Sequence, residues 1–371
     1  MKEGCRQMFP FIKTLVLSLG GAFLFYLVGF PLPWLLGPLT VIIIYRFFVF
    51  SPLYWPSGLR QTGLVILGYA LGSYFTLDMV RQLLVHLPAM FISTVLLILF
   101  SVLLSLGLFR LTGEDWPSLL IGSIPGGLAQ MVVLGEELEQ INPIVVTMMQ
   151  MIRILVVIFL VPGIIWVWSQ YGGEVLLSTS DFRFGEQRAQ AAPVFHYLLF
   201  LLAVIAGVAA AVKLSLPTAY LIGPSIATII VILLGVPAPE LPAPIFILSQ
   251  LFIGTHLGLQ IQPGKILERR KLGLYTLLSS LLLLVFTLLM AFVMSQVYDV
   301  SILSAYLSMA PGGIAEMGIT AKEVGADLTL VTGYHLFRVF FILLVLAPLL
   351  KWWIPRFGRH SGKQGKSQVT L

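Results

Sequence analysis

Charged side chains are scarce in this 371-residue chain: Asp, Glu, Lys and Arg together make up 10% of it, whereas 58% of the residues are hydrophobic. Soluble globular domains carry about 25% charged and about 45–50% apolar residues. The mean hydropathy of +0.99 is correspondingly high. Apolar runs of about 20 residues, the length that crosses a bilayer, recur along the whole chain. The composition therefore predicts an all-α polytopic membrane protein.

Cysteine and histidine are also scarce. The single Cys5 excludes an intramolecular disulfide, and we expect it to be a free thiol. The five histidines are scattered, and no phosphate-binding, zinc-binding or Ser-His-Asp motif is present. We therefore expect no metal, no cofactor, no catalytic residues and no enzymatic activity. A monooxygenase in particular would need clustered metal ligands.

Basic residues outnumber acidic ones, and the formal net charge is +6. They gather at the chain ends and in a few loops, a distribution that sets membrane orientation rather than one that binds nucleic acid. We expect a lipid bilayer and a small solute or ion as partners and no nucleic acid, while a homodimer stays open. Lys2, Arg6 and Lys13 precede the first apolar stretch, which we take as a retained span because no small-residue cleavage site stands out.

An internal repeat organises the chain. Its two halves match at a constant offset of 186 residues, which becomes 185 after one deleted residue. Chance does not hold one register across so many Gly, Pro and Arg positions. The matched features are Leu36-Gly37-Pro38 with Ile222-Gly223-Pro224, Gly68 and Gly72 with Gly254 and Gly258, Pro125-Gly126-Gly127 with Pro311-Gly312-Gly313, and Arg153 with Arg338.

Each half contains six apolar segments. We predict a first membrane repeat at 11–169, a polar linker at 170–192, a second membrane repeat at 193–353 and a basic cytoplasmic tail at 354–371. The expected segments are 11–30, 33–50, 60–76, 88–110, 115–138 and 143–169 in the first repeat, and 194–213, 217–235, 242–260, 272–298, 302–324 and 327–353 in the second.

Two topologies fit these segments. If all six segments of each half cross the membrane, the protein has twelve spans and two parallel repeats. If the Pro-Gly-Gly segment enters and leaves on one side, the protein has about ten spans and two inverted repeats. Apart from Arg153 and Arg338, twenty Lys and Arg lie in loops or near segment ends; the inverted arrangement places 16 of them inside and 4 outside, against 13 and 7 for the parallel one. The positive-inside rule therefore favours inverted repeats with two broken or re-entrant segments and both termini cytoplasmic.

Two apolar segments, 115–138 and 302–324, are interrupted by Pro-Gly-Gly. Proline lacks an N–H, and glycine permits left-handed backbone angles, so each helix should break there. Irregular backbone inside a membrane is tolerated only where protein or water covers it, and transporters bind solutes near the midplane at such paired breaks. A packing turn between close helices is the alternative. We predict substrate or ion binding at Pro125, Gly126, Gly127, Pro311, Gly312 and Gly313.

Arginines at equivalent positions, Arg153 and Arg338, lie in the apolar helices that follow the two breaks. Burying an arginine in a bilayer costs at least about 2.5–3.5 kcal/mol, so each should face a cavity or a partner. Gln150 and His335 lie three residues earlier on the same helical faces. A guanidinium beside an amide or an imidazole suits an anion such as a carboxylate. The same groups could instead bind the free carbonyls of the broken segment.

Directly after the second break stands Glu316, where the first repeat has Gln130. A carboxylate at a half-helix N-terminus is stabilised by the helix dipole. Glu316 could pair with one of the two arginines, or bind a proton or a sodium ion. Asn142 and Asp327 open the last helix of each repeat, where helix capping explains them.

These paired stretches resemble the AbrB/AmoA-like family of duplicated bacterial integral membrane proteins. The resemblance rests on both Pro-Gly-Gly motifs, the Leu-Gly-Pro motifs, Gly325-Ala326-Asp327, and Gln150-x-x-Arg153, and it covers about 11–353. The chain departs from the pattern at His335, where glutamine is expected. It departs again at Asn142-Pro143, where Ala-Asp is expected.

Members of that family are labelled as regulators or ammonia monooxygenases, and they differ from the small soluble DNA-binding AbrB proteins. The family is similar to cation/proton antiporters and bile-acid-type symporters, which use paired broken helices. The resemblance implies a multi-pass protein of the bacterial inner membrane.

The leading hypothesis for function is a secondary transporter of a small anionic solute, coupled to H⁺ or Na⁺. The alternative is a membrane-bound regulator or sensor that affects gene expression indirectly, because the sequence contains no soluble domain that could bind DNA itself.

Overall fold

The computed structural model describes residues 2–30, 32–49, 51–75, 77–127, 130–131, 134–135, 138, 141–171, 193–216, 218–261 and 269–361. Within these ranges the regular structure is helical and no strand occurs. The predicted linker lies outside the described residues after Tyr171, and so does the tail after Ser361.

Helix boundaries recur between the two halves. Helices α2, α3 and α5 begin 186 residues before α9, α10 and α13, and α7 begins 185 residues before α15. The first half contains α1 (Lys2–Leu27), α2 (Pro33–Phe48), α3 (Ser57–Ser73), α4 (Leu77–Thr112), α5 (Trp116–Ser123) and α7 (Pro143–Tyr171). The second half contains α8 (Val194–Lys213), α9 (Ala219–Leu233), α10 (Ala243–Gln260), α12 (Arg270–Tyr298), α13 (Ile302–Met309), α14 (Ile314–Glu323), α15 (Leu328–Phe341), the π-helical turn η1 (Ile342–Leu346) and α16 (Ala347–Ser361).

Seven helical stretches among the described residues are long and apolar enough to cross a bilayer. The shorter helices α2 and α9 are apolar as well. Large hydrophobic side chains remain exposed along the outer faces, as in Phe23 of α1, Leu103 of α4 and Val285 of α12. Exposed apolar faces of this extent need lipid rather than water around them. The predicted all-α polytopic membrane protein is thereby confirmed.

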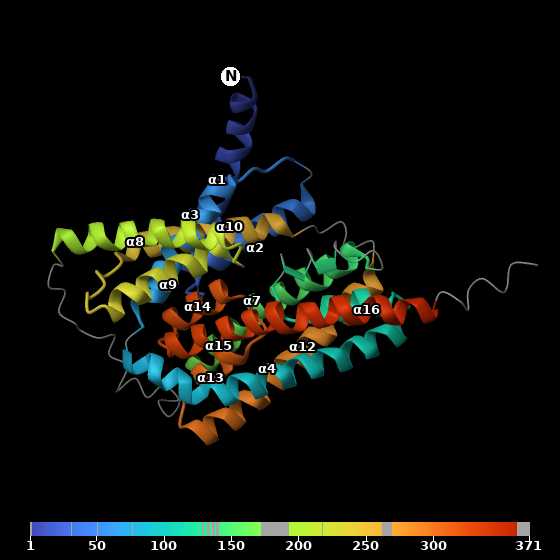
Figure 1. Cartoon of the computed structure of the whole chain (residues 1–371). Helices are drawn as coiled ribbons and strands as arrows, with labels where there is room; N and C mark the ends of the chain where they lie inside the picture. Colours follow the sequence, from blue (N-terminus) through green and yellow to red (C-terminus); the bar gives the residue numbers. More distant parts are fainter. Residues whose placement is uncertain are drawn as a thin grey trace, which may run out of the picture.

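The helices form two layers (Figure 1). One layer packs the first three helices of each half together, with α2 against α1 and α10, and α9 against α8 and α3. The other layer packs the last helices of each half, with α12 against α4, α7 and α13. Helices α14 and α15 reach from this second layer to α3. Each layer therefore contains elements from both halves.

Equivalent helices α4 and α12 run antiparallel. Phe100 and Phe286, which occupy the same position in the two repeats, stack with ring centroids 4.1 Å apart. At one end of the pair His86 lies 4.8 Å from the ring of Tyr298, and at the other end Glu114 pairs with Arg269. An inverted repeat requires such an antiparallel relation between equivalent helices. The orientation of the halves in a bilayer stays a prediction.

Close helix contacts depend on glycine. A Cβ on Gly68 would overlap the carbonyl oxygen of Leu221 in α9, and a Cβ on the equivalent Gly254 would overlap that of Leu35 in α2. Both clashes involve backbone, which has no rotamer to change. The Gly-x-x-x-Gly spacing in α3 and α10 therefore lets helices from different halves touch at backbone distance.

Two neighbouring glycines of α1 allow a matched test of such a contact. A Cβ on Gly21 would lie 2.5 Å from the carbonyl oxygen of Gly37, whereas a Cβ on Gly20 meets no atom within 4 Å. We expect Gly21→Ala to lower the free energy of unfolding by about 1–3 kcal/mol through overpacking. Gly20→Ala should be neutral or stabilising by up to about 1 kcal/mol, because alanine favours helix. Thermal unfolding in detergent measures both, and equal melting temperatures would contradict the packing argument.

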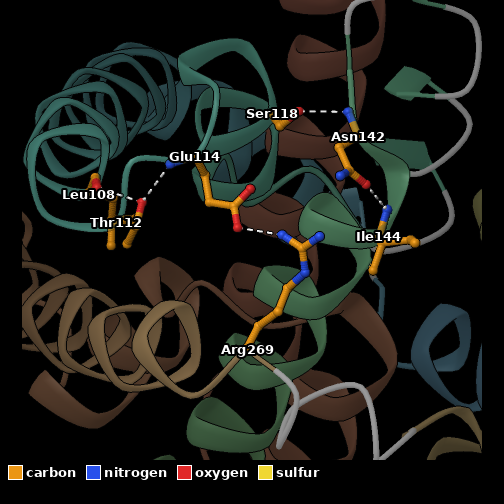
Figure 2. A network of polar contacts seen from close by, with 7 residues as sticks. All are labelled: Leu108, Thr112, Glu114, Ser118, Asn142, Ile144 and Arg269. Atoms are coloured by element: carbon orange, nitrogen blue, oxygen red, sulfur yellow. Dashed lines mark hydrogen bonds and ion pairs between the residues drawn. The ribbon is translucent and has the colours of Figure 1, made fainter.

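Both interrupted segments fold back as hairpins. The backbone N–H of Asn142, at the start of α7, donates to Ser118 Oγ at the start of α5 over 2.7 Å (Figure 2). The N–H of Asp327, before α15, donates to Ser304 Oγ of α13 over 2.8 Å. The chain thus returns to where it entered, which a segment running straight across a bilayer cannot do. That each hairpin re-enters the membrane, and from which side, stays a prediction.

Candidate functional site

In the first hairpin, helix α5 ends at Ser123, and side chains of α7 donate hydrogen bonds to the carbonyl groups at that end. Arg153 Nη1 donates to the carbonyl oxygens of Gly122, Ser123 and Ile124 at 3.2–3.4 Å. Gln150 Nε2 donates to Ile121, Gly122 and Ile124 at 3.0–3.3 Å, and Gln150 Oε1 accepts a bond from Arg153 Nη2. The carbonyls at a helix C-terminus have no partner within the helix, so this pair replaces the missing donors.

The second hairpin repeats this arrangement with one substitution. Arg338 donates to the carbonyl oxygens of Met309, Ala310 and Gly312 at 2.9–3.3 Å. His335 Nδ1 lies 2.6 Å from Arg338 Nη2, and His335 Nε2 lies 2.9 Å from Leu307 O. Because a guanidinium only donates, Nδ1 accepts and Nε2 carries the proton given to the carbonyl. Like Gln150 in the first repeat, His335 thus accepts a hydrogen bond from its arginine and donates one to a hairpin carbonyl.

Glycines at the hairpin tips serve two different needs. Gly127 has φ +87°, a left-handed conformation that other residues rarely adopt. Gly313 has φ −80°, which any residue adopts, but a Cβ there would overlap the carboxylate of Glu316. Left-handed geometry, which the sequence made available at both breaks, is thus used at Gly127, whereas a side chain at Gly313 would have to displace the Glu316 carboxylate.

A cavity of about 140 Å³ lies between the two layers, where the hairpin tips meet. A single water needs about 10–15 Å³ on this measure, so the cavity has room for several waters or a small solute. The predicted site residues that line it are Pro125, Gly127, Gln130, Arg153, Pro311, Gly312, Gly313, Glu316 and Arg338.

Three of the predicted residues lie beside this cavity rather than in its lining. Gln150 and His335 are hydrogen-bonded to hairpin carbonyls and to the neighbouring arginines. Gly126 packs against Met131 and against Ile342 of η1. The two roles considered for the arginines turn out to coexist, because Arg153 and Arg338 bind carbonyls with Nη atoms and still line the cavity.

Both arginines keep one donor unused. Arg153 and Arg338 are each only 4% exposed, and the Nε of each has no hydrogen-bond partner among the described residues. The two guanidiniums are also close enough to repel each other electrostatically. A buried donor without a partner costs about 1–3 kcal/mol. Two buried guanidinium groups in one cavity lining favour an acceptor that carries negative charge there.

Glu316 has a different charged neighbour from those considered in the sequence. It is the third residue of α14, and its carboxylate folds back toward Gly313 at the N-terminus of that helix. The described residues contain no ion pair between Glu316 and Arg60, Arg153 or Arg338; the cation whose charge acts on it is Arg60 of α3, which lines the same cavity. Gln130 folds back on Gly127 in the same way.

Sequence reasoning missed four polar residues of the cavity. They are Arg60 of α3, Thr218 before α9, and His256 and Gln260 of α10. Arg60 begins an apolar stretch and so counts as a loop charge when segments are drawn from hydropathy. His256 lies inside an apolar segment, and an ionisable residue at membrane depth is a signal that could have found it.

Helix capping at the hairpin bases is as predicted. Asp327 Oδ1 accepts from Leu330 N at 2.9 Å, and Asn142 Oδ1 accepts from Ile144 N at 3.0 Å (Figure 2). Losing such a cap costs about 1 kcal/mol. We expect Asp327→Ala to lower the free energy of unfolding by about that amount and Asp327→Asn to restore most of it. Thermal unfolding checks this, and a loss with asparagine equal to that with alanine would contradict a capping role.

Comparison with known proteins places these features in a wider group. The family described as "Transition state regulatory protein AbrB" matches residues 34–354. The chain is 26% identical over 360 residues to "Uncharacterized protein YhjN" of Bacillus subtilis (strain 168), which covers 91% of each chain. It is also 26% identical over 335 residues to "Putative regulator AbrB" of Escherichia coli (strain K12), which covers 90% of this chain and 92% of that relative.

Proposed function

The chain belongs to the AbrB family, and from its two-layer fold and central cavity we propose that it is a secondary transporter of a small anionic solute. The observation that carries this proposal is the pair of buried arginines. Arg153 and Arg338 come from equivalent helices of the two repeats, line one cavity, and each keep an unpartnered Nε. An anion bound beside them would offset their charge and screen their mutual repulsion.

Charge in the cavity supports an anion as the solute. Arg60, Arg153 and Arg338 are opposed by Glu316 alone among the charged side chains of its lining. Even with Glu316 ionised, the lining therefore carries excess positive charge. Uncompensated charge in a low-dielectric site is costly, and a bound anion reduces that cost. The size of the cavity limits the solute to a small molecule.

Placement of the cavity supports transport rather than simple binding. It lies where two hairpin tips meet, and its walls come from both helix layers. Transporters place solute sites at such interrupted helices between two repeats, and movement of one part against the other exposes the site alternately to each side. We further propose an inner-membrane location with both termini cytoplasmic, as the distribution of basic residues predicts, and a driving gradient of H⁺ or Na⁺.

Regulation is the second candidate, and the name of the Escherichia coli relative favours it. A regulator with this fold would sense a ligand in the same cavity and act through a partner protein. It would bind the anion without moving it across the membrane. Uptake measurements therefore separate the two candidates.

The test uses the full chain in proteoliposomes and in detergent. We expect at least one small anion of a broad panel to raise the melting temperature and to accumulate in vesicles when a proton or sodium gradient is imposed. Arg153→Gln should weaken both effects at least tenfold, whereas Arg110→Gln, on the exposed end of α4, should change neither. Stabilisation without accumulation would support a sensor, and the absence of both would refute an anion site.

A further inference from the structure

Ionisable groups are distributed unequally over the pseudo-symmetric cavity. The arginines Arg153 and Arg338 occupy equivalent positions in the two repeats. Glu316, in contrast, stands where the first repeat has Gln130. Both side chains fold back on the hairpin glycine three residues before them, so an uncharged amide takes this position as well as a carboxylate does. The charge of Glu316 is therefore more than this position requires.

A second asymmetry faces the first. Arg60 lines the cavity from α3, and its counterpart in the second repeat is Phe246, which lies under the ammonium group of Lys322 at 3.7 Å from the ring centroid. His256 lines the cavity from α10, and its counterpart is Ala70. Glu316 and Arg60 thus each lack a charged counterpart in the other repeat.

Charged and titratable side chains around Glu316 come from four other helices. Arg60 faces it from α3 and acts on it electrostatically, His256 lines the same cavity from α10, and Arg338 and Arg153 line it from α15 and α7. Within α14 the other charged residues, Lys322 and Glu323, are engaged elsewhere, by Phe246 and by Gln250. An anion that enters this cavity therefore meets the positive charge of Arg60 and the negative charge of Glu316 in the same lining.

We propose that Glu316 carries the coupling proton, so that one anion binds together with one proton taken up by this carboxylate. The inference rests on the proposed anion transport. An ionised Glu316 repels the anion and offsets part of the positive charge of Arg60; adding a proton to the carboxylate removes the repulsion and leaves that positive charge to the solute. By linkage, a bound anion favours the protonated acid to the same degree.

A proton fits this position better than a sodium ion. A metal cation needs several oxygen ligands in a defined shell, and it would lie among three guanidinium groups that repel it. A proton needs one oxygen and neutralises the carboxylate without adding a positive centre. Arg60 and Glu316 also come from opposite layers, so the same proton weakens the electrostatic attachment of α14 to α3.

The test measures anion affinity against pH in the full chain. Chloride, nitrate, methanesulfonate and lactate stay ionised between about pH 5 and pH 9, so any pH dependence belongs to the protein. Dissociation constants follow from the rise in melting temperature with anion concentration. We expect the wild-type constant to increase about tenfold per pH unit where Glu316 is ionised in the free protein. Glu316→Gln should keep the tight, low-pH affinity at every pH.

Matched variants decide where the proton binds. Glu323→Gln removes a carboxylate from the same helix outside the cavity and should retain the wild-type slope. Arg60→Gln should weaken binding at low pH at least tenfold. A slope that survives in Glu316→Gln, or that disappears in His256→Gln instead, would overturn the proposal. If none of the four anions stabilises the wild type at any pH, the anion site itself fails, which is a different outcome.

Discussion

Alanine in place of Arg338 is expected to lower the free energy of unfolding by about 3–5 kcal/mol and to abolish stabilisation by anions. Three carbonyl oxygens, those of Met309, Ala310 and Gly312, lose their donor together, and His335 Nδ1 loses its partner. Each buried polar group left without a partner costs about 1–3 kcal/mol. Because these carbonyls shape the second hairpin tip, the wall of the cavity changes with them.

Lysine at the same position separates charge from geometry. Arg338→Lys keeps the positive charge but cannot reach several carbonyls at once, since an ammonium group lacks the planar fork of a guanidinium. We expect it to recover less than half of the lost stability. Arg110→Ala, at an exposed arginine of α4, serves as the control and should stay within about 0.5 kcal/mol of wild type. Denaturant unfolding in detergent gives the values, and an alanine variant as stable as the control would refute the structural role.

Valine in place of Gly127 is expected to cost about 3 kcal/mol and to disrupt the first hairpin tip. The backbone there has φ +87°, and a β-branched residue at positive φ is strained by about 1–3 kcal/mol. Its Cβ would also overlap the amide oxygen of Gln130 and displace that side chain. Strain and the displaced side chain act on the same turn, so their costs add to one local distortion.

Two other glycines make this expectation specific. Gly107→Val places the same side chain on α4 at a point where a Cβ meets no atom within 4 Å, so its effect should be limited to about 1 kcal/mol. Gly313→Val, at φ −80°, should displace Glu316 without backbone strain and fall between the two. Melting temperatures and anion binding of all three variants check this order. If Gly127→Val matches Gly107→Val, the left-handed turn is not what the tip needs.

Tests of the site and tests of the fold report on different residues. Arg153 and Arg338 serve both, since their Nη atoms hold the hairpins and their side chains line the cavity. Glu316 and Arg60 are better reporters of function, because glutamine already occupies the position equivalent to Glu316 in the first repeat, where Gln130 lies against Gly127. A glutamine at position 316 should therefore change pH dependence without unfolding the protein.

Local sequence was sufficient for the membrane class, the repeat and the two breaks. Long apolar runs must be buried in lipid whatever their tertiary arrangement, and a constant offset between Gly, Pro and Arg positions needs no structure to be recognised. Asp327 as a helix cap was predictable for the same reason, because its bond to Leu330 N spans only three residues. Arg153 and Arg338 were recognisable as partners of something, since a lone arginine in an apolar helix is too costly.

Only the tertiary structure decided what those residues touch. The two ends of each hairpin are joined by a hydrogen bond between residues more than 20 positions apart, as between Asn142 N and Ser118 Oγ. Hydropathy cannot reveal this, because it assigns the same apolar character to a hairpin and to a crossing segment. Arg60 and Glu316 line one cavity because α3 packs against α14, a contact between elements that are far apart in the sequence. Sequence periodicity reports on burial within one helix, whereas opposite charges from two layers come into one cavity through packing. The sequence alone therefore specifies a duplicated membrane protein with two broken segments, and packing turns those breaks into one cavity with an acid on one side.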